Sequence, residues 1–212
     1  MTAHPFSLDL TETQLRALAA HGVARTFQRN AVVINEGDET DSLYIILSGK
    51  VKVYLADESG KEVVLNTAGP GSYFGEMVLD GGPRSASVMT LEKSVFSVVS
   101  KCEFRKFLSE NPDVAIYIIE NLIARTRALT ENVKSLALMD VYGRVARTLL
   151  ELATELEGKL VIADRMTQQD LANRVGASRE MVSRILKDLS AGGYISIEGK
   201  RIQIIKKLPL HW

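Results

Sequence analysis

Five polar residues in the C-terminal part of the chain could together read the edges of DNA bases. On a helical wheel they share one sector of about 140°, and they are Arg179, Glu180, Ser183, Arg184 and Lys187. An arginine can donate two hydrogen bonds to O6 and N7 of guanine, and a glutamate can accept one from N4 of cytosine. This combination of residue types therefore suits a face that enters a DNA major groove.

The residues around this face predict the elements that must position it. The opposite side of the wheel is apolar and comprises Val182, Ile185, Leu186 and Leu189. Upstream, Thr167 and Asp170 have the spacing of a capping box, which predicts a short helix over about 168–174. Gly176 lies in the turn that follows, and Ser178 can cap the second helix. Two short helices joined by a tight turn form a helix-turn-helix.

A predicted hairpin follows the second helix. Ile195 and Ile197 alternate with polar residues, a turn occurs at Glu198-Gly199-Lys200, and Ile202 and Ile204 return. Such a wing would bring Lys200 to DNA phosphates, contacts that position a protein without reading sequence. The alternative is an ordinary amphipathic helix with a solvated face, and the capped helix, glycine turn and hairpin argue against it. The predicted DNA-contacting set is Thr167, Gln168, Ser178, Arg179, Glu180, Ser183, Arg184, Lys187 and Lys200.

A second group of residues could hold a phosphate and a sugar. Arg84 offers a planar fork to phosphate oxygens, and Ser85 adds a hydroxyl and a backbone N–H. Glu76 could accept a ribose hydroxyl, Gly75 allows a close backbone approach, and Met77 lies beside them. The alternative is that Arg84 and Glu76 pair with each other as a structural ion pair.

Residues 24–100 predict an antiparallel barrel or roll, because short alternating strands are separated by glycine-containing turns. Helices are expected at 9–21 and 101–109, followed by a helix over 113–138 without Pro or Gly. An apolar stripe of this length favours a homodimeric coiled coil, although the helix could instead pack within one subunit. The predicted dimer interface is Ile118, Leu122, Arg125, Leu129, Val133 and Leu136.

Asp140 is a plausible N-cap for a further helix over 141–156, which places a boundary and hinge just before it. The predicted domains are a roll over 1–110, a dimerisation helix and hinge over 111–139, and a DNA-binding domain over 140–212. The first 139 residues carry 14 Lys and Arg against 17 Asp and Glu, and the remaining residues carry 12 against 9. A C-terminal excess of positive charge is consistent with nucleic-acid binding.

Several functional classes are excluded by residues that the chain lacks. Cys102 is the single cysteine, so one chain cannot build a disulfide framework, a zinc site or an iron–sulfur cluster, and the three histidines lack ligand spacing. No nucleophile elbow or P-loop is present, so we do not expect an enzyme. No apolar run approaches the roughly 18 residues of a membrane helix and no signal-peptide pattern occurs, so we expect a cytoplasmic protein.

The segment "MTQQDLANRVGASREMVSRILKDL" with its wing strongly resembles the cyclic-AMP receptor protein (CRP/FNR) family of winged-helix regulators. The segment "YFGEMVLDGGPRSASV" resembles the phosphate-binding cassette of cyclic-nucleotide domains. The resemblance covers nearly the whole chain. It implies an α+β fold with an N-terminal antiparallel β-roll, a long dimerisation helix and a C-terminal winged helix-turn-helix.

The family resemblance also implies a function. The base-reading positions match at Arg179, Glu180 and Arg184, so double-stranded DNA with a palindromic TGTGA-like site is expected, with RNA polymerase as a further partner. A cyclic nucleotide would act as the allosteric effector.

Two departures from the family pattern leave the effector open. Only seven residues separate Glu76 from Arg84, one or two fewer than usual, and the family's adenine-contacting pair matches Leu129 and Thr130, of which only Thr130 can hydrogen-bond. The predicted effector site is Gly75, Glu76, Met77, Arg84, Ser85 and Thr130. Cyclic AMP is favoured; the alternatives are cyclic di-GMP, another effector, or constitutive DNA binding with a vestigial pocket.

Overall fold

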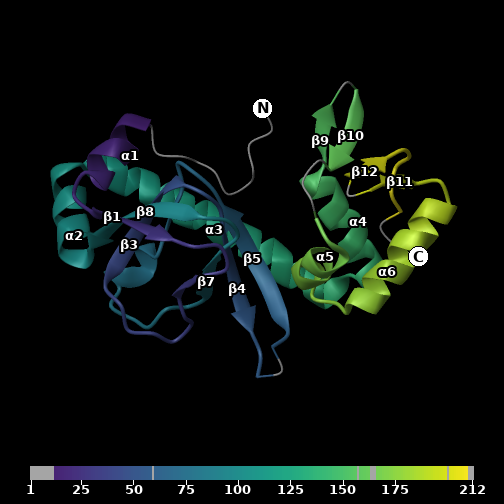
Figure 1. Cartoon of the computed structure of the whole chain (residues 1–212), viewed down its shortest axis with the longest axis horizontal. Coiled ribbons are helices and arrows are strands. Elements are labelled where there is room, and N and C mark those ends of the chain that lie inside the picture. The colour runs from purple at the N-terminus through teal and green to yellow at the C-terminus, as the bar shows by residue number, and fades with distance from the viewer. Residues whose placement is uncertain (1–11, 59, 157, 163–165, 200, 210–212) are drawn as a thin grey trace. The chain divides into compact units, whose positions relative to one another are not determined.

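The computed structural model describes residues 12–58, 60–156, 158–162, 166–199 and 201–209 (Figure 1). Contacts divide the chain into two compact units, one centred on residues 3–57 and 64–128, the other on 129–212 with the short segment 58–63. Each unit is described by itself. The mixture of helices and antiparallel sheets confirms the predicted α+β fold class.

The N-terminal unit is built on two four-stranded sheets, in which five of the six neighbouring strand pairs have a described register and all five are antiparallel. The first sheet has the order β1 (Val23–Phe27), β8 (Ser94–Ser100), β3 (Ser42–Ser48) and β6 (Tyr73–Phe74). The second has the order β2 (Val32–Ile34), β7 (Ser87–Thr90), β4 (Val51–Ala56) and β5 (Glu62–Ala68). This arrangement confirms the roll that the alternating pattern predicts.

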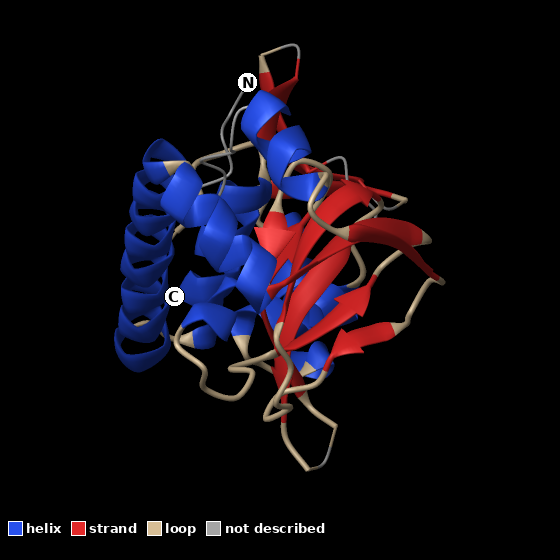
Figure 2. Cartoon of the chain, turned by 90° about the vertical axis from the view of Figure 1, so that its left-hand side faces the viewer, coloured by secondary structure: helices blue, strands red, loops and turns tan. Residues whose placement is uncertain are grey.

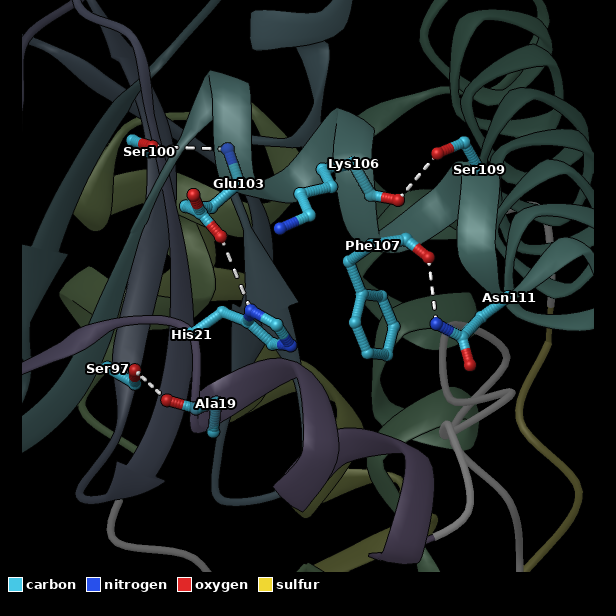
Figure 3. A network of polar contacts seen from close by, with 9 residues as sticks. All are labelled: Ala19, His21, Ser97, Ser100, Glu103, Lys106, Phe107, Ser109 and Asn111. Atoms are coloured by element: carbon cyan, nitrogen blue, oxygen red, sulfur yellow. Dashed lines mark hydrogen bonds and ion pairs between the residues drawn. The ribbon is translucent and has the colours of Figure 1, made fainter.

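Short helices pack against the first sheet, beside its red strands in Figure 2. They are α1 (Glu12–Ala19) and α2 (Lys101–Glu110), and their buried side chains include Leu18 and Phe104. Ser100 caps α2 by accepting from the backbone N–H of Glu103 at 3.2 Å (Figure 3). The predicted helix over 9–21 ends earlier than expected, at Ala19, and residues 9–11 lie outside the described part.

Side-chain hydrogen bonds fix both ends of this helical layer (Figure 3). The nitrogen Nδ1 of His21 lies 3.3 Å from a carboxylate oxygen of Glu103, and the Ser97 hydroxyl donates to the Ala19 carbonyl at 2.7 Å. Asn111 donates to the Phe107 carbonyl at 2.9 Å, where α2 ends. These contacts tie α1 and α2 to the sheet that carries the candidate effector site.

A long helix, α3 (Pro112–Leu138), follows directly and contributes to both units. Helix α4 (Val141–Leu152) begins where the sequence predicts, because the Asp140 carboxylate accepts from the backbone N–H of Gly143 at 2.7 Å. Among the described residues no helix is long and apolar enough to cross a membrane.

The C-terminal unit contains a four-stranded sheet in the order β11 (Ile195–Glu198), β12 (Arg201–Ile204), β10 (Lys159–Ile162) and β9 (Thr154–Leu156). The predicted helix over 141–156 was wrong at its end: α4 stops at Leu152 and Thr154 begins the hairpin β9–β10. The helical spacing of Leu152 and Leu156 extends past the true boundary. Pairing of β10 with β12 decided the outcome, and that partner lies some 40 residues away.

Candidate functional site

The helix-turn-helix forms as its caps predict. Helix α5 (Gln168–Val175) begins with a capping box, in which the Thr167 hydroxyl accepts from the Asp170 N–H at 3.1 Å and the Asp170 carboxylate accepts from the Thr167 N–H at 2.8 Å. The helix ends at Gly176, whose φ of 65° is left-handed and favours glycine. The chain then turns directly into the second helix.

Helix α6 (Arg179–Ala191) has one buried and one exposed face, as the wheel predicts. Ser178 caps it by accepting from the Met181 N–H at 3.2 Å. The apolar side chains Val182, Ile185, Leu186 and Leu189 are buried in the core of this unit. Arg179, Glu180, Arg184 and Lys187 are exposed, whereas Ser183 is half-buried.

The four charged side chains on this face are not engaged elsewhere. Within the described part of the chain, none of Arg179, Glu180, Arg184 and Lys187 forms an ion pair or a side-chain hydrogen bond. Thr167 and Gln168 are exposed at the start of α5. Donors and acceptors without internal partners can meet base edges and phosphates at no cost in broken protein contacts.

The predicted wing is the hairpin β11–β12, in which Ile195 pairs with Ile204 and Ile197 pairs with Ile202. Arg201 is exposed beside the turn. Lys200, predicted to contact phosphate, lies outside the described residues.

In the N-terminal unit, Arg84 is buried, with 6% of its surface exposed. Its guanidinium donates three hydrogen bonds: Nε to the Thr40 hydroxyl at 2.6 Å, Nη1 to the Gly75 carbonyl at 2.9 Å and Nη2 to the Ser42 carbonyl at 2.6 Å. Gly75 has a φ of 85°, and a Cβ there would lie 2.9 Å from Nη1. The glycine is therefore required both by its backbone and by the close approach of the arginine.

The charged guanidinium of Arg84 is hydrogen-bonded to neutral oxygen atoms. Among the described residues no carboxylate pairs with it directly, and burial lowers its pKa against the opposing effect of Tyr44, Glu76 and other neighbours. An arginine has five N–H donors, and three are used, which leaves one on each terminal nitrogen. A buried guanidinium with two remaining N–H groups and no counter-ion is suited to an anion such as phosphate.

Glu76 does not pair with Arg84, so the alternative of a structural ion pair between them is wrong. Glu76 begins the short 3₁₀ helix η1 (Glu76–Leu79), and its carboxylate accepts instead from Nη1 of Arg125 on α3 at 2.7 Å. The Arg125 guanidinium also lies 5.2 Å from the centre of the Tyr73 ring. Burial raises the pKa of Tyr73 to about 12, partly offset by the charge of Arg125.

Two other predicted effector residues, Ser85 and Met77, contact each other. The Ser85 hydroxyl donates to the Met77 sulfur at 3.1 Å, and both side chains are exposed. A thioether is a weak acceptor, so the hydroxyl can turn to a stronger one at little cost. Thr130 is exposed on α3 and already has an interaction partner.

The exposed apolar residues of α3 are only partly those of the predicted dimer seam. Ile118 is buried in the core of its own unit, Leu122 packs against that core, and Arg125 is bound to Glu76, so all three side chains have contacts within the single chain. Ile116, Ile119 and Ile123 are exposed in their place, and Leu129, Val133 and Leu136 are exposed as predicted. Several apolar stripes run along this helix and the roll covers one of them, so the seam stays a prediction.

Sequence reasoning thus missed two features. Residues 116, 119 and 123 have the three- and four-residue spacing of a coiled-coil seam, a signal that was present but ambiguous. The Glu76–Arg125 contact joins residues 49 positions apart, and no local pattern indicates it.

Comparisons with known protein families match both units. Residues 24–111 match the cyclic nucleotide-binding domain, and residues 143–209 match the Crp-like helix-turn-helix domain. The CRP-like cAMP-activated global transcriptional regulator of Mycobacterium tuberculosis (strain ATCC 25618 / H37Rv) is 37% identical over 183 residues, which cover 84% of this chain and 82% of that protein. The cAMP-activated global transcriptional regulator CRP of Escherichia coli O157:H7 is 33% identical over 202 residues, covering 92% and 95%.

Solved structures show the same architecture. The c-di-GMP responsive global regulator CLP of Xanthomonas campestris is 28% identical with a TM-score of 0.79, and the match covers 92% of this chain and 99% of that one. A CooA mutant from Carboxydothermus hydrogenoformans also has a TM-score of 0.79, covering 91% and 87%, but at 19% identity it supports the fold alone.

Proposed function

We propose, because the chain belongs to the cyclic-AMP receptor protein (CRP/FNR) family of transcription regulators, that it is a homodimer whose reading of DNA is controlled allosterically by a cyclic nucleotide. The family establishes a cyclic nucleotide-binding domain and a DNA-binding helix-turn-helix. The proposal adds the dimer, the effector, the DNA site and the residues that serve each.

The buried guanidinium of Arg84 is the observation that carries the effector proposal. Desolvating a charge without a counter-ion is costly, and the three neutral oxygens around Arg84 compensate only part of that cost. A cyclic phosphate would supply the missing negative charge and accept from the two remaining N–H groups. Ser85 would add its hydroxyl once it leaves Met77, with Gly75 shaping the loop.

Glu76 would accept a hydrogen bond from a ribose hydroxyl, as it accepts one from Arg125 in this structure. Binding of a nucleotide at Glu76 would compete with or reshape the Glu76–Arg125 contact, so the pocket and α3 would respond together. Thr130 is proposed to contribute a hydrogen bond from the same helix. We therefore propose that Arg125 belongs to the effector site and not to the dimer seam.

Cyclic AMP is the favoured effector, because the similar regulators of Mycobacterium tuberculosis and Escherichia coli are described as cAMP-activated. Cyclic di-GMP is the second candidate. It is favoured by the short spacing between Glu76 and Arg84, by Leu129 in place of a polar base contact, and by the similarity to the c-di-GMP responsive regulator.

At the DNA end, Arg179, Glu180 and Arg184 are proposed to read a TGTGA-like half-site. Ser183 and Lys187 would support the contact from α6, Ser178 and Thr167 with Gln168 from the helix starts, and Lys200 from the wing. A palindromic site needs two reading helices, and a second copy of the chain would supply the other. RNA polymerase is the expected further partner.

The dimer is proposed to form along the exposed stripe of α3. Its members are Ile116, Ile119, Ile123, Leu129, Val133 and Leu136, which are all about half exposed in the single chain. The proposed domain boundaries follow the sequence: a roll over 1–110, the helix and hinge over 111–139, and the DNA-binding domain over 140–212.

Isothermal titration calorimetry with cyclic AMP, cyclic GMP and cyclic di-GMP tests the effector proposal. We expect heat from cyclic AMP, and Arg84→Gln should weaken binding by about 10- to 100-fold, since a charge-assisted hydrogen bond contributes about 1.5–3 kcal/mol. Arg25→Gln, an exposed arginine on β1, is the matched control and should bind like the wild type. Heat from none of the three nucleotides in folded protein would instead indicate a vestigial pocket or a different effector.

A further inference from the structure

One arginine of the C-terminal unit holds the ends of two different helices. Arg144 lies in the first turns of α4 and is half-buried. Its Nε donates to the Val175 carbonyl and its Nη1 to the Met139 carbonyl, both at 2.9 Å. Val175 is the last residue of α5, and Met139 directly follows the last residue of α3.

Both acceptors are carbonyls of a kind that helices leave unsatisfied. The last carbonyls of a helix have no N–H partner within it, and they carry the negative end of the helix dipole. A cation placed there is stabilised by the dipole and satisfies the carbonyl. Arg144 does this for α3 and α5 at once, because its rigid planar guanidinium donates from two different nitrogens, Nε and Nη1, whereas a lysine carries its three donors on a single nitrogen.

Within the described residues, the two carbonyls are the hydrogen-bond partners of the Arg144 guanidinium. Among the residues that the structure describes, no carboxylate forms an ion pair with it. If the end of α3 and the end of α5 moved apart, one N–H of a half-buried guanidinium would lose its acceptor. The two helix ends are therefore favoured to move as one body.

The position of Val175 makes this contact relevant to DNA reading. After Val175 the chain needs only Gly176 and Ala177 to reach Ser178, the cap of the reading helix α6. On the other side, Met139 directly follows α3, the continuous helix whose Arg125 binds Glu76 of the candidate pocket. Arg144 thus joins the end of α3 to the turn that aims α6.

Another arginine on the same helix provides a comparison. Arg147 also reaches α3, with Nη1 lying 3.8 Å from a carboxylate oxygen of Glu131, and it pairs with Glu151 of its own helix at 2.7 Å. These partners are about half exposed, and such pairs contribute little. Arg147 has no contact with α5 among the hydrogen bonds and ion pairs of the described residues.

We propose that Arg144 is the positioning residue that makes the helix-turn-helix follow the end of α3, and that it thereby transmits the effector response to the DNA-reading helix. This inference rests on the proposed function for the existence of an effector response. The contact itself does not depend on which nucleotide binds.

The test compares the full-length wild type with Arg144→Gln, Arg144→Lys and the matched control Arg147→Gln. DNA affinity is measured by fluorescence anisotropy on a TGTGA-type palindrome, with and without saturating cyclic AMP, and then with cyclic di-GMP. The ratio of the two DNA affinities measures the coupling between the sites. We expect this ratio to fall at least fivefold in Arg144→Gln and less in Arg144→Lys, and to stay within twofold in Arg147→Gln.

A merely structural role would give a different pattern. Calorimetry should find the affinity for cyclic AMP in the absence of DNA within twofold of wild type in every variant. Coupling between two binding sites is reciprocal. The factor by which DNA raises the nucleotide affinity must therefore fall as much as the factor by which the nucleotide raises the DNA affinity. A wild-type ratio in Arg144→Gln, or an equal loss in Arg147→Gln, would overturn the proposal.

If neither nucleotide changes the DNA affinity of the wild type, that result counts against the proposed effector alone. Hydrogen exchange then tests the role of Arg144 without a nucleotide. In ligand-free protein the amides of 139–143 and 175–178 should exchange faster in Arg144→Gln than in Arg147→Gln. Unchanged protection of both segments would show that Arg144 does not join the two helix ends. If Arg144→Gln fails to fold, the same comparison is made with Arg144→Lys, which retains the charge.

Discussion

The proposed effector site and the proposed DNA-reading face both contain arginine, but the surroundings of the arginines are opposite in kind. Arg184 and Arg179 are exposed and have no internal partner, whereas Arg84 is buried and bound to three neutral oxygens. A surface that reads DNA gains from donors that lose nothing on binding. A pocket that controls the protein gains from groups already engaged in internal contacts, because a ligand must rearrange those contacts and so alters the structure around them.

The difference extends to the acidic partners. Glu180 on α6 has no partner among the described residues, whereas Glu76 is nearly buried and paired with Arg125. Changes at the reading face should therefore alter DNA affinity alone, and changes at the pocket should alter the response to ligand. The following experiments test this separation, from the largest expected effect to the smallest.

Removing the support of the reading face should have the largest effect. Leu189 is a fully buried residue of α6, and Leu189→Ala should lower the free energy of unfolding of the C-terminal unit by about 2–5 kcal/mol. Urea unfolding followed by circular dichroism measures the loss, and specific DNA binding should fall with it. Cyclic AMP titrations should remain unchanged, and a parallel loss of nucleotide binding would contradict the separation of the two ends.

Disrupting the proposed dimer should weaken DNA binding and leave nucleotide binding unchanged. Ile119→Glu places a carboxylate in the apolar stripe of each helix, which should raise the dimer dissociation constant at least about 100-fold because the charge would have to be desolvated. Analytical ultracentrifugation measures this change, with Lys93→Glu, an exposed charge swap on the roll, as the control. A dimer of undiminished stability would show that the exposed isoleucines are not the seam.

Shortening one reading side chain should cost specificity. Arg184→Ala should weaken binding to the TGTGA-type site by about 1–3 kcal/mol, the amount expected for one base-pair readout contact. Binding to random DNA should change much less, because phosphate contacts remain. Equal losses on specific and random DNA in anisotropy titrations would assign Arg184 to phosphates instead of bases.

The pH dependence of Tyr73 should be the smallest effect under ordinary conditions. Its pKa is raised from 10.0 to about 12 by burial, so folding favours the neutral phenol. The stability that this provides is complete below pH 10 and is lost as the pH rises through 12. Burial also raises the pKa of Tyr142, so ultraviolet titration at alkaline pH should show late tyrosinate steps, of which Tyr73→Phe removes one; a step near pH 10 for all six tyrosines would refute the burial argument.

The helix-turn-helix was predictable from the sequence because its determinants are local. The capping box at Thr167, the left-handed turn at Gly176 and the two-sided wheel of α6 each involve residues within about one or two helical turns. Propensity, capping and periodicity all favour the same structure here. The sequence therefore specified the exposed and buried faces of α6 almost residue by residue.

The contacts of the proposed effector residues, and the choice of which face of α3 is buried, were decided only by tertiary structure. Which stripe of α3 is covered depends on the roll packing against Ile118 and Leu122, and the same helical periodicity fits Ile116 and Ile119 equally well. The pairing of Glu76 with Arg125, and of Arg84 with the Ser42 carbonyl, joins residues 49 and 42 positions apart in the chain. Local sequence could name these residues, but only the packing of roll against helix settled which charge meets which, because burial sets the cost of leaving each one unpaired.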